Sequence, residues 1–146
     1  MDVADAIALY LLLEQQPGAY RHALEQLKSP TAALAASAHQ WRAAGMSAAA
    51  CERRAAWPKG RSVEVIREQW LKSLHWLEAE RRGVWFDSSA NDDPSQAWPR
   101  AFAELPKRPP LLFWEGDDSV LGLPQIAIVG SRAATRAGLA QAQSLA

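Results

Sequence analysis

A continuous apolar run, Gln-Ile-Ala-Ile-Val at residues 125–129, is followed directly by Gly130-Ser131-Arg132 and then by a helical stretch. A short apolar run of this kind is typical of a strand buried on both faces of a parallel sheet. Such a strand needs neighbouring strands beside it and helices above and below. The pattern therefore predicts the start of a doubly wound α/β domain, which one strand–helix step cannot complete. We expect the chain to be the N-terminal part of a longer protein.

The turn after this predicted strand has the composition of an anion site. Gly130 allows a sharp backbone turn, the Ser131 hydroxyl and the amides that follow can face the strand end, and Thr135 can cap the next helix. Arg132 offers a planar donor fork suited to phosphate. The next glycine is Gly138 and no Gly-Lys-Ser/Thr follows, which disfavours dinucleotide and triphosphate loops. Phosphates along a polymer fit better, although an ordinary turn with a solvated Arg132 fits the spacing equally well.

The chain before this block divides into two parts. Residues 1–82 read as helical, and residues 83–146 contain short strand candidates at GVWF (83–86) and LLFW (111–114). The longest expected helix runs from Ser62 to about Arg82. Further local signals are a stop of the first helix at Pro17-Gly18, N-caps at Ser29 and Ser47, and a C-cap at Gly45. We expect α+β to α/β architecture, with a helical domain at 1–82 and an incomplete sheet domain at 83–146.

Composition excludes several classes of protein. Sixteen basic residues balance sixteen acidic ones, so a nucleic-acid site must be a local patch. The single Cys51 excludes a disulfide framework, and a small buried thiol is the favoured interpretation. The three histidines have no metal-ligand spacing. No secretory signal and no apolar run of ~18 residues is present, so we expect a cytoplasmic protein without a membrane span. No catalytic set stands out, so we expect neither an enzyme nor a cofactor.

Charge and aromatic residues are unevenly placed. From Ser119 to Ala146 the only ionisable side chains are Arg132 and Arg136. Seven tryptophans are present, and packing is the favoured role for all of them. We expect Trp70, Trp85 and Trp114 to pack, whereas exposure, and with it base stacking, is open to Trp41, Trp57, Trp76 and Trp98.

Residues 109–142 resemble the DNA-processing protein A family (DprA, also called Smf). The shared features are Pro109-Pro110-Leu111-Leu112-Phe113, Gly116-Asp117, Leu121, Pro124, Ile126–Arg132, Thr135 and Gly138. Trp98-Pro99 stands where the family commonly has Tyr-Pro. The N-terminal half resembles the family's helical domain most closely at SPTAALAAS, residues 29–37.

The resemblance implies a SAM-like helical domain followed by a Rossmann-like domain that binds single-stranded DNA without base preference. It also implies the RecA recombinase as partner, loaded onto DNA during natural transformation. Arg132 corresponds to the family's DNA-binding arginine, Gly130 and Ser131 to the loop beside it, and Arg136 to a less constrained position. The downstream family elements are absent from this sequence, so we expect a homodimer only of the full-length protein.

Three alternatives stay open at this point. A Rossmann-like nucleotide phosphoribohydrolase would need a Pro-Gly-Gly-x-Gly-Thr loop and a glutamate further along the chain, and this sequence ends too soon to show either. Residues 1–82 could instead form an independent protein-interaction module. Pro17-Gly18-Ala19-Tyr20 resembles the hairpin of a helix-hairpin-helix motif but lacks its second glycine, so a structural turn is favoured.

Overall fold

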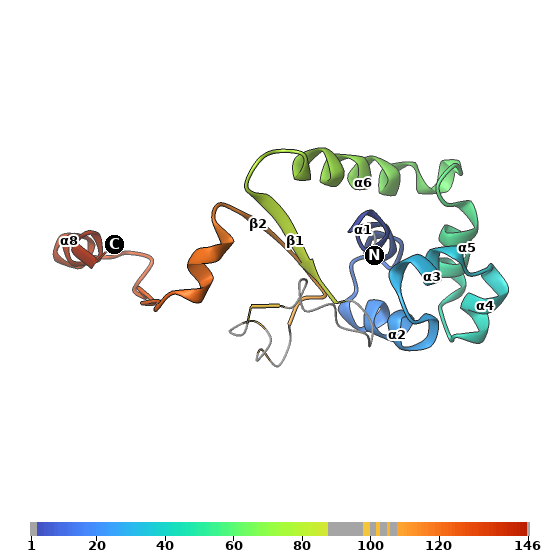
Figure 1. Cartoon of the computed structure of the whole chain (residues 1–146), viewed down its shortest axis with the longest axis horizontal. Helices are drawn as coiled ribbons and strands as arrows, with labels where there is room; N and C mark the ends of the chain where they lie inside the picture. Colours follow the sequence, from blue (N-terminus) through green and yellow to red (C-terminus); the bar gives the residue numbers. More distant parts are fainter. Residues whose placement is uncertain (1–2, 88–97, 100–101, 103–104, 106–107, 146) are drawn as a thin grey trace.

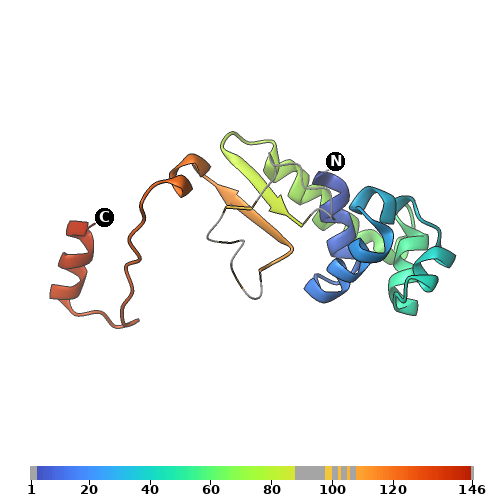
Figure 2. The ribbon, with the colours of Figure 1, turned by 60° about the horizontal axis from the view of Figure 1, so that its bottom comes forward.

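The computed structural model describes residues 3–87, 98–99, 102, 105 and 108–145. Short helices gather at one end, a two-stranded sheet lies beside them, and the C-terminal helix lies at the far end of the molecule (Figure 1 and Figure 2). The elements, in chain order, are α1 (Val3–Leu12), α2 (Pro17–Leu27), α3 (Pro30–Ala35), α4 (Ala38–Ala43), α5 (Ala48–Ala56), η1 (Arg61–Val63), α6 (Glu64–Leu77), β1 (Arg82–Phe86), β2 (Leu111–Glu115), η3 (Asp118–Gly122) and α8 (Arg136–Leu145).

Side-chain caps start three of the short helices. The Ser29 and Ser47 hydroxyls accept the amides three residues ahead, as predicted. Ser37 forms a full capping box with Gln40 at the start of α4. Gly45 has φ +78°, the left-handed conformation that ends a helix at low cost in glycine, so its predicted capping role is confirmed.

The connection between α1 and α2 differs from its prediction. Helix α1 ends at Leu12, and Glu14 and Gln15 take positive φ values of 56° and 57°. Pro17 then occupies the first turn of α2 instead of stopping α1, because its missing N–H has no intrahelical partner to lose at that position.

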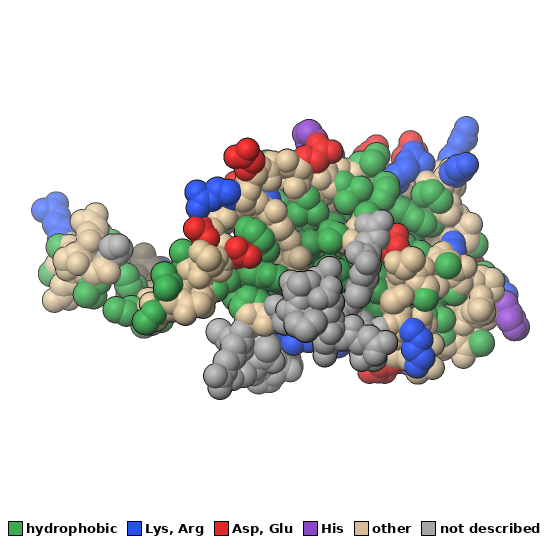
Figure 3. Space-filling model, in the orientation of Figure 1, with side chains coloured by type: hydrophobic (Ala, Val, Ile, Leu, Met, Phe, Trp, Pro, Cys, Tyr) green, Lys and Arg blue, Asp and Glu red, His purple; other side chains and the backbone are tan. Residues whose placement is uncertain are grey.

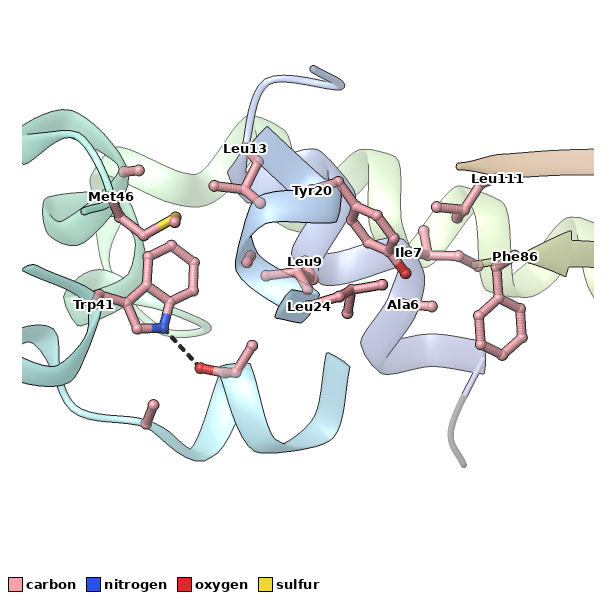
Figure 4. Close-up of a cluster of buried hydrophobic side chains, with 14 of the residues drawn as sticks. Ala6, Ile7, Leu9, Leu13, Tyr20, Leu24, Trp41, Met46, Phe86 and Leu111 are labelled. Atoms are coloured by element: carbon pink, nitrogen blue, oxygen red, sulfur yellow. Dashed lines mark hydrogen bonds between the residues drawn. The ribbon is translucent and has the colours of Figure 1, made fainter. Parts of the chain in front are cut away.

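The hydrophobic core lies among helices α1 to α5 and extends to the two strands (Figure 4). Trp41 is fully buried, and its indole Nε1 donates to the Ala33 carbonyl at 2.8 Å. This burial agrees with the favoured packing role of Trp41 and excludes the base stacking that the sequence left open for it. Phe86 of β1 and Leu111 of β2 belong to the same buried cluster as the helical residues. Helix α6 packs against it through Trp70, Leu74 and Leu77, which are partly buried.

A buried ionic cluster also joins the helices to the strands. The Asp87 carboxylate follows β1 and is 8% exposed. It accepts from Arg21 Nε at 3.0 Å and from an Arg108 terminal nitrogen at 2.6 Å. Arg21 also donates to the Arg108 carbonyl, and the Tyr20 hydroxyl donates to the Asp87 carbonyl at 3.2 Å. Helix α2 is thus tied to both ends of the segment that connects β1 and β2.

The two strands pair antiparallel, with Arg82 opposite Glu115 and Phe86 opposite Leu111. Both strand predictions, GVWF and LLFW, are confirmed. Gly83 lies under the Trp114 ring, and a Cβ at Gly83 would come within 2.4 Å of that ring. The described residues therefore form an α+β arrangement, and the only sheet among them is this antiparallel pair.

The apolar run at residues 125–129 does not form a strand in this structure. It is irregular, and Ile126 and Val129 are 77% and 88% exposed. The prediction of a strand buried on both faces is wrong here for a physical reason. A strand is held by backbone hydrogen bonds to a neighbour, and no such neighbour lies beside this run among the described residues.

Candidate nucleic-acid interface

Residues Gly130, Ser131 and Arg132 lie in an exposed irregular segment that leads to α8. Ser131 Oγ accepts a hydrogen bond from the Ala133 amide at 3.2 Å, and this bond stabilises a turn centred on Arg132. Gly130 does not have a positive φ, and a Cβ would meet nothing within 4 Å. The sharp glycine-dependent turn expected at Gly130 is therefore absent from this structure.

Thr135 starts α8. Its Oγ1 accepts the Gly138 amide at 3.2 Å, and its carbonyl accepts the Leu139 amide at 3.0 Å. The predicted capping role of Thr135 is confirmed. Arg136 is the first residue of α8 and is exposed. A helix of ten residues thus begins just after the Arg132 turn, with its positive dipole end on the side of the two arginines.

The two arginines are free to bind an anion. Neither Arg132 nor Arg136 has a hydrogen bond or ion pair to any described residue, and both are exposed. The nearest acidic side chains in the sequence are Asp117 and Asp118, and Asp117 binds Ser119 and Arg81. A guanidinium without a carboxylate partner keeps its full donor fork for phosphate. Gly130, Ser131, Arg132 and Arg136 are near one another in sequence, within residues 130–136, and no contact among the described residues joins the two arginines to the Gly130-Ser131 turn.

Apolar side chains flank this polar turn. An open hollow of about 620 Å³ lies between the extended segment and α8. Its lining includes Ile126, Ile128, Val129, Leu139 and Leu145. Arg132 and Arg136 do not line it, so the cationic groups and the apolar hollow are separate features of the same segment.

Local contacts account for Cys51, His22 and His75, of which only Cys51 is buried. Cys51 is fully buried, with its thiol 3.8 Å from the Met46 carbonyl, as expected of a small core residue. The His22 ring contacts the Ala44 carbonyl, and His75 contacts Glu78. Across the described part of the chain, no group of three histidine, cysteine or carboxylate residues could hold a metal. None of the described helices is long and apolar enough to cross a membrane.

Both faces of the β1–β2 pair carry aromatic rings, and the packing expected of Trp85 and Trp114 is confirmed. On one face, Trp85 stacks on Trp114 with ring centroids 5.7 Å apart, and Trp98 and Phe102 pack beside Trp85. The side chains of a strand alternate between its two faces, so Phe113 lies on the other face, toward α6. The alternation in LLFW could have indicated this, but the partner ring on α6 could not be read from the sequence.

One comparison with known proteins finds a similarity, and it lies in the C-terminal part of the chain. Residues 92–146 match the family described as DNA recombination-mediator protein A, which supports a general role in DNA recombination. No curated protein and no solved structure gives a significant match. The matched range contains the Gly-Ser-Arg block and its lead-in from Pro109. The match confirms, over residues 92–146, the resemblance to the DNA recombination-mediator protein A family that is seen in the sequence.

Proposed function

We propose that the chain binds single-stranded DNA through Arg132, with Arg136 and the turn at Gly130 and Ser131 beside it. The observation that carries this proposal is the exposed, unpaired Arg132 within the range that matches the recombination-mediator family. Single strands are bound by cations along the backbone, and counterion release makes the affinity depend on salt. Base identity plays no part in such contacts, so binding without base preference is expected.

The Rossmann-like architecture belongs to the same proposal. Residues 125–129 would take a strand position once paired with strands that the described residues do not supply. Their exposed isoleucine and valine side chains support this, because β-branched residues left in water favour burial in a sheet. Arg132 would then lie at the carboxyl end of that strand and before α8, where α/β sheets bind their ligands.

A second part of the proposal concerns the partner. We propose that the DNA-bound protein loads the RecA recombinase onto the strand, as the family resemblance implies. A strand coated with single-strand-binding protein tests this, with ATP hydrolysis by RecA as the readout. Hydrolysis should start sooner when the chain is added, and no change in its onset would contradict the loading role.

The DNA-binding proposal is tested by fluorescence anisotropy with a labelled oligo-dT. Arg132→Glu should weaken binding by about tenfold or more, because it replaces a phosphate contact with a repulsive charge. Arg61→Glu is the matched control, since Arg61 is exposed on η1 and the charge change is identical. Equal affinities for the Arg132 variant and the unaltered chain would contradict the site assignment.

A further inference from the structure

A groove lies between α6 and β2 and is continuous with the side of α1. Two adjoining hollows of about 270 and 300 Å³ share Lys72, Ser73 and Phe113 as lining residues. Figure 3 shows hydrophobic side chains gathered below α6 on this face of the molecule. We propose that this groove takes one unpaired base of a DNA strand, a second contact that rests on the proposed single-strand binding.

The exposed ring of Phe113, which packs against Trp76, forms the floor of the groove. Phe113 is 40% exposed, although its strand neighbour Leu111 on the same face is buried. The Trp76 ring meets Phe113 edge-on, with centroids 5.7 Å apart and planes at 82°. The Arg82 guanidinium lies 4.8 Å from the Trp76 ring centre, and Arg82 is itself paired with Glu115. The phenyl ring is therefore fixed in place while much of it stays open, as a stacking platform requires.

The charge beside this platform suits a nucleotide. Lys72 lies one helical turn before Trp76, lines both hollows and is exposed. Its ammonium group has no carboxylate partner among the described residues. No acidic side chain lines either hollow. A base stacked on Phe113 would bring its phosphate within reach of Lys72, which no carboxylate of the described residues neutralises.

The rim of the groove favours a nucleotide over an apolar peptide. Gln15 and Gln69 line the hollow toward α1, so amide donors and acceptors surround the apolar floor. An amphipathic helix needs a longer run of apolar contacts, with anchors spaced over two helical turns. Side-chain amides offer both donors and acceptors and can meet the edge of any base, which agrees with binding that ignores sequence.

The test compares an oligo-dT with a strand of the same length whose central nucleotides lack bases. Phe113→Ala removes the stacking surface and should weaken oligo-dT binding about fivefold or more, with much less effect on the abasic strand. Phe113→Trp should restore the affinity, because it keeps an aromatic face. Leu71→Ala is the matched control, since Leu71 is an exposed apolar residue of α6 that does not line the groove.

The second part of the test reverses the charge of Lys72 in the same binding assay. Lys72→Glu should weaken binding of both strands by about threefold or more, whereas Lys59→Glu, at an exposed lysine outside the groove, should not. Equal loss on both strands with Phe113→Ala, or a change of oligomeric state in place of DNA affinity, would overturn the groove assignment. If Arg132→Glu still weakens binding in that case, only the groove proposal fails. If the unaltered chain binds neither strand, the proposed function fails with it.

Discussion

Replacing Asp87 by alanine should lower the free energy of unfolding, because Asp87 links the helices to the segment that connects β1 and β2. The Asp87 carboxylate is buried and accepts two charge-assisted hydrogen bonds, from Arg21 at 3.0 Å and from Arg108 at 2.6 Å. Removing it leaves two guanidinium groups facing each other without an anion. The damage should therefore appear as lost stability of the whole described fold and not as a local loosening.

The magnitude follows from the exposure of the three side chains. A hydrogen bond to a charged group contributes about 1.5–3 kcal/mol net. The side chains of Arg21 and Arg108 are 38% and 29% exposed, so solvent screens each contact and the lower figure applies. Two such contacts give a loss of about 3 kcal/mol, which corresponds to a fall in Tm of about 10 °C for a chain of this size.

Urea titration followed by far-UV circular dichroism measures this loss. Glu115→Ala is the matched control, because Glu115 binds Arg82 at 2.8 Å with a side chain that is 61% exposed. That exposed pair should contribute under about 1 kcal/mol. Adding Arg21→Met to Asp87→Ala should cost less than the two single changes together, because they remove one shared contact. A loss below about 0.5 kcal/mol for Asp87→Ala, or equal losses for the two carboxylates, would refute the reasoning.

Three further predictions concern the core, the hairpin and high pH. Trp41→Phe should lose about 2 kcal/mol in urea unfolding, because the hydrogen bond to the Ala33 carbonyl disappears and a void remains; an unchanged midpoint would contradict this. Gly83→Ala should lose about 1–3 kcal/mol and alter the near-UV tryptophan signal, since its Cβ would overlap the Trp114 ring; an unaltered spectrum would argue against that contact. Burial, with the nearby Asp87 charge, raises the pKa of Tyr20 above its usual 10.0. The stability that this protonated hydroxyl contributes is complete below pH 10.0 and declines above it, as the unfolded state ionises first. Tyr20→Phe should show a shallower decline in unfolding free energy as the pH rises above about 10, and an equal decline would count against it.

Local signals in the sequence predicted local structure well. The caps at Ser29, Ser47 and Thr135 and the helix end at Gly45 each depend on residues within four positions of one another. The two strands of the hairpin were also predicted. The caps need only a few neighbouring residues to form, whereas the pairing of the two strands joins residues 82–86 to residues 111–115.

Features that join distant segments could not be predicted in the same way. The Asp87 cluster brings together residues separated by 66 positions, and the pairing of Trp76 with Phe113 joins α6 to β2. The apolar run at residues 125–129 was also mispredicted because its burial depends on distant segments. Its apolar character indicated a buried strand, but burial depends on partners that periodicity does not reveal. Arg132 was named as a candidate from a short sequence motif, and its role stays a prediction.

The central claim is that the Arg132 guanidinium binds a phosphate of single-stranded DNA. The most direct measurement is the salt dependence of oligo-dT binding by the unaltered chain and by Arg132→Gln. Each phosphate contact on a single strand contributes about 0.7 to the slope of log affinity against log salt. The account predicts that the slope for Arg132→Gln is shallower by about that amount. A slope identical to that of the unaltered chain would show that Arg132 makes no phosphate contact and would contradict the account.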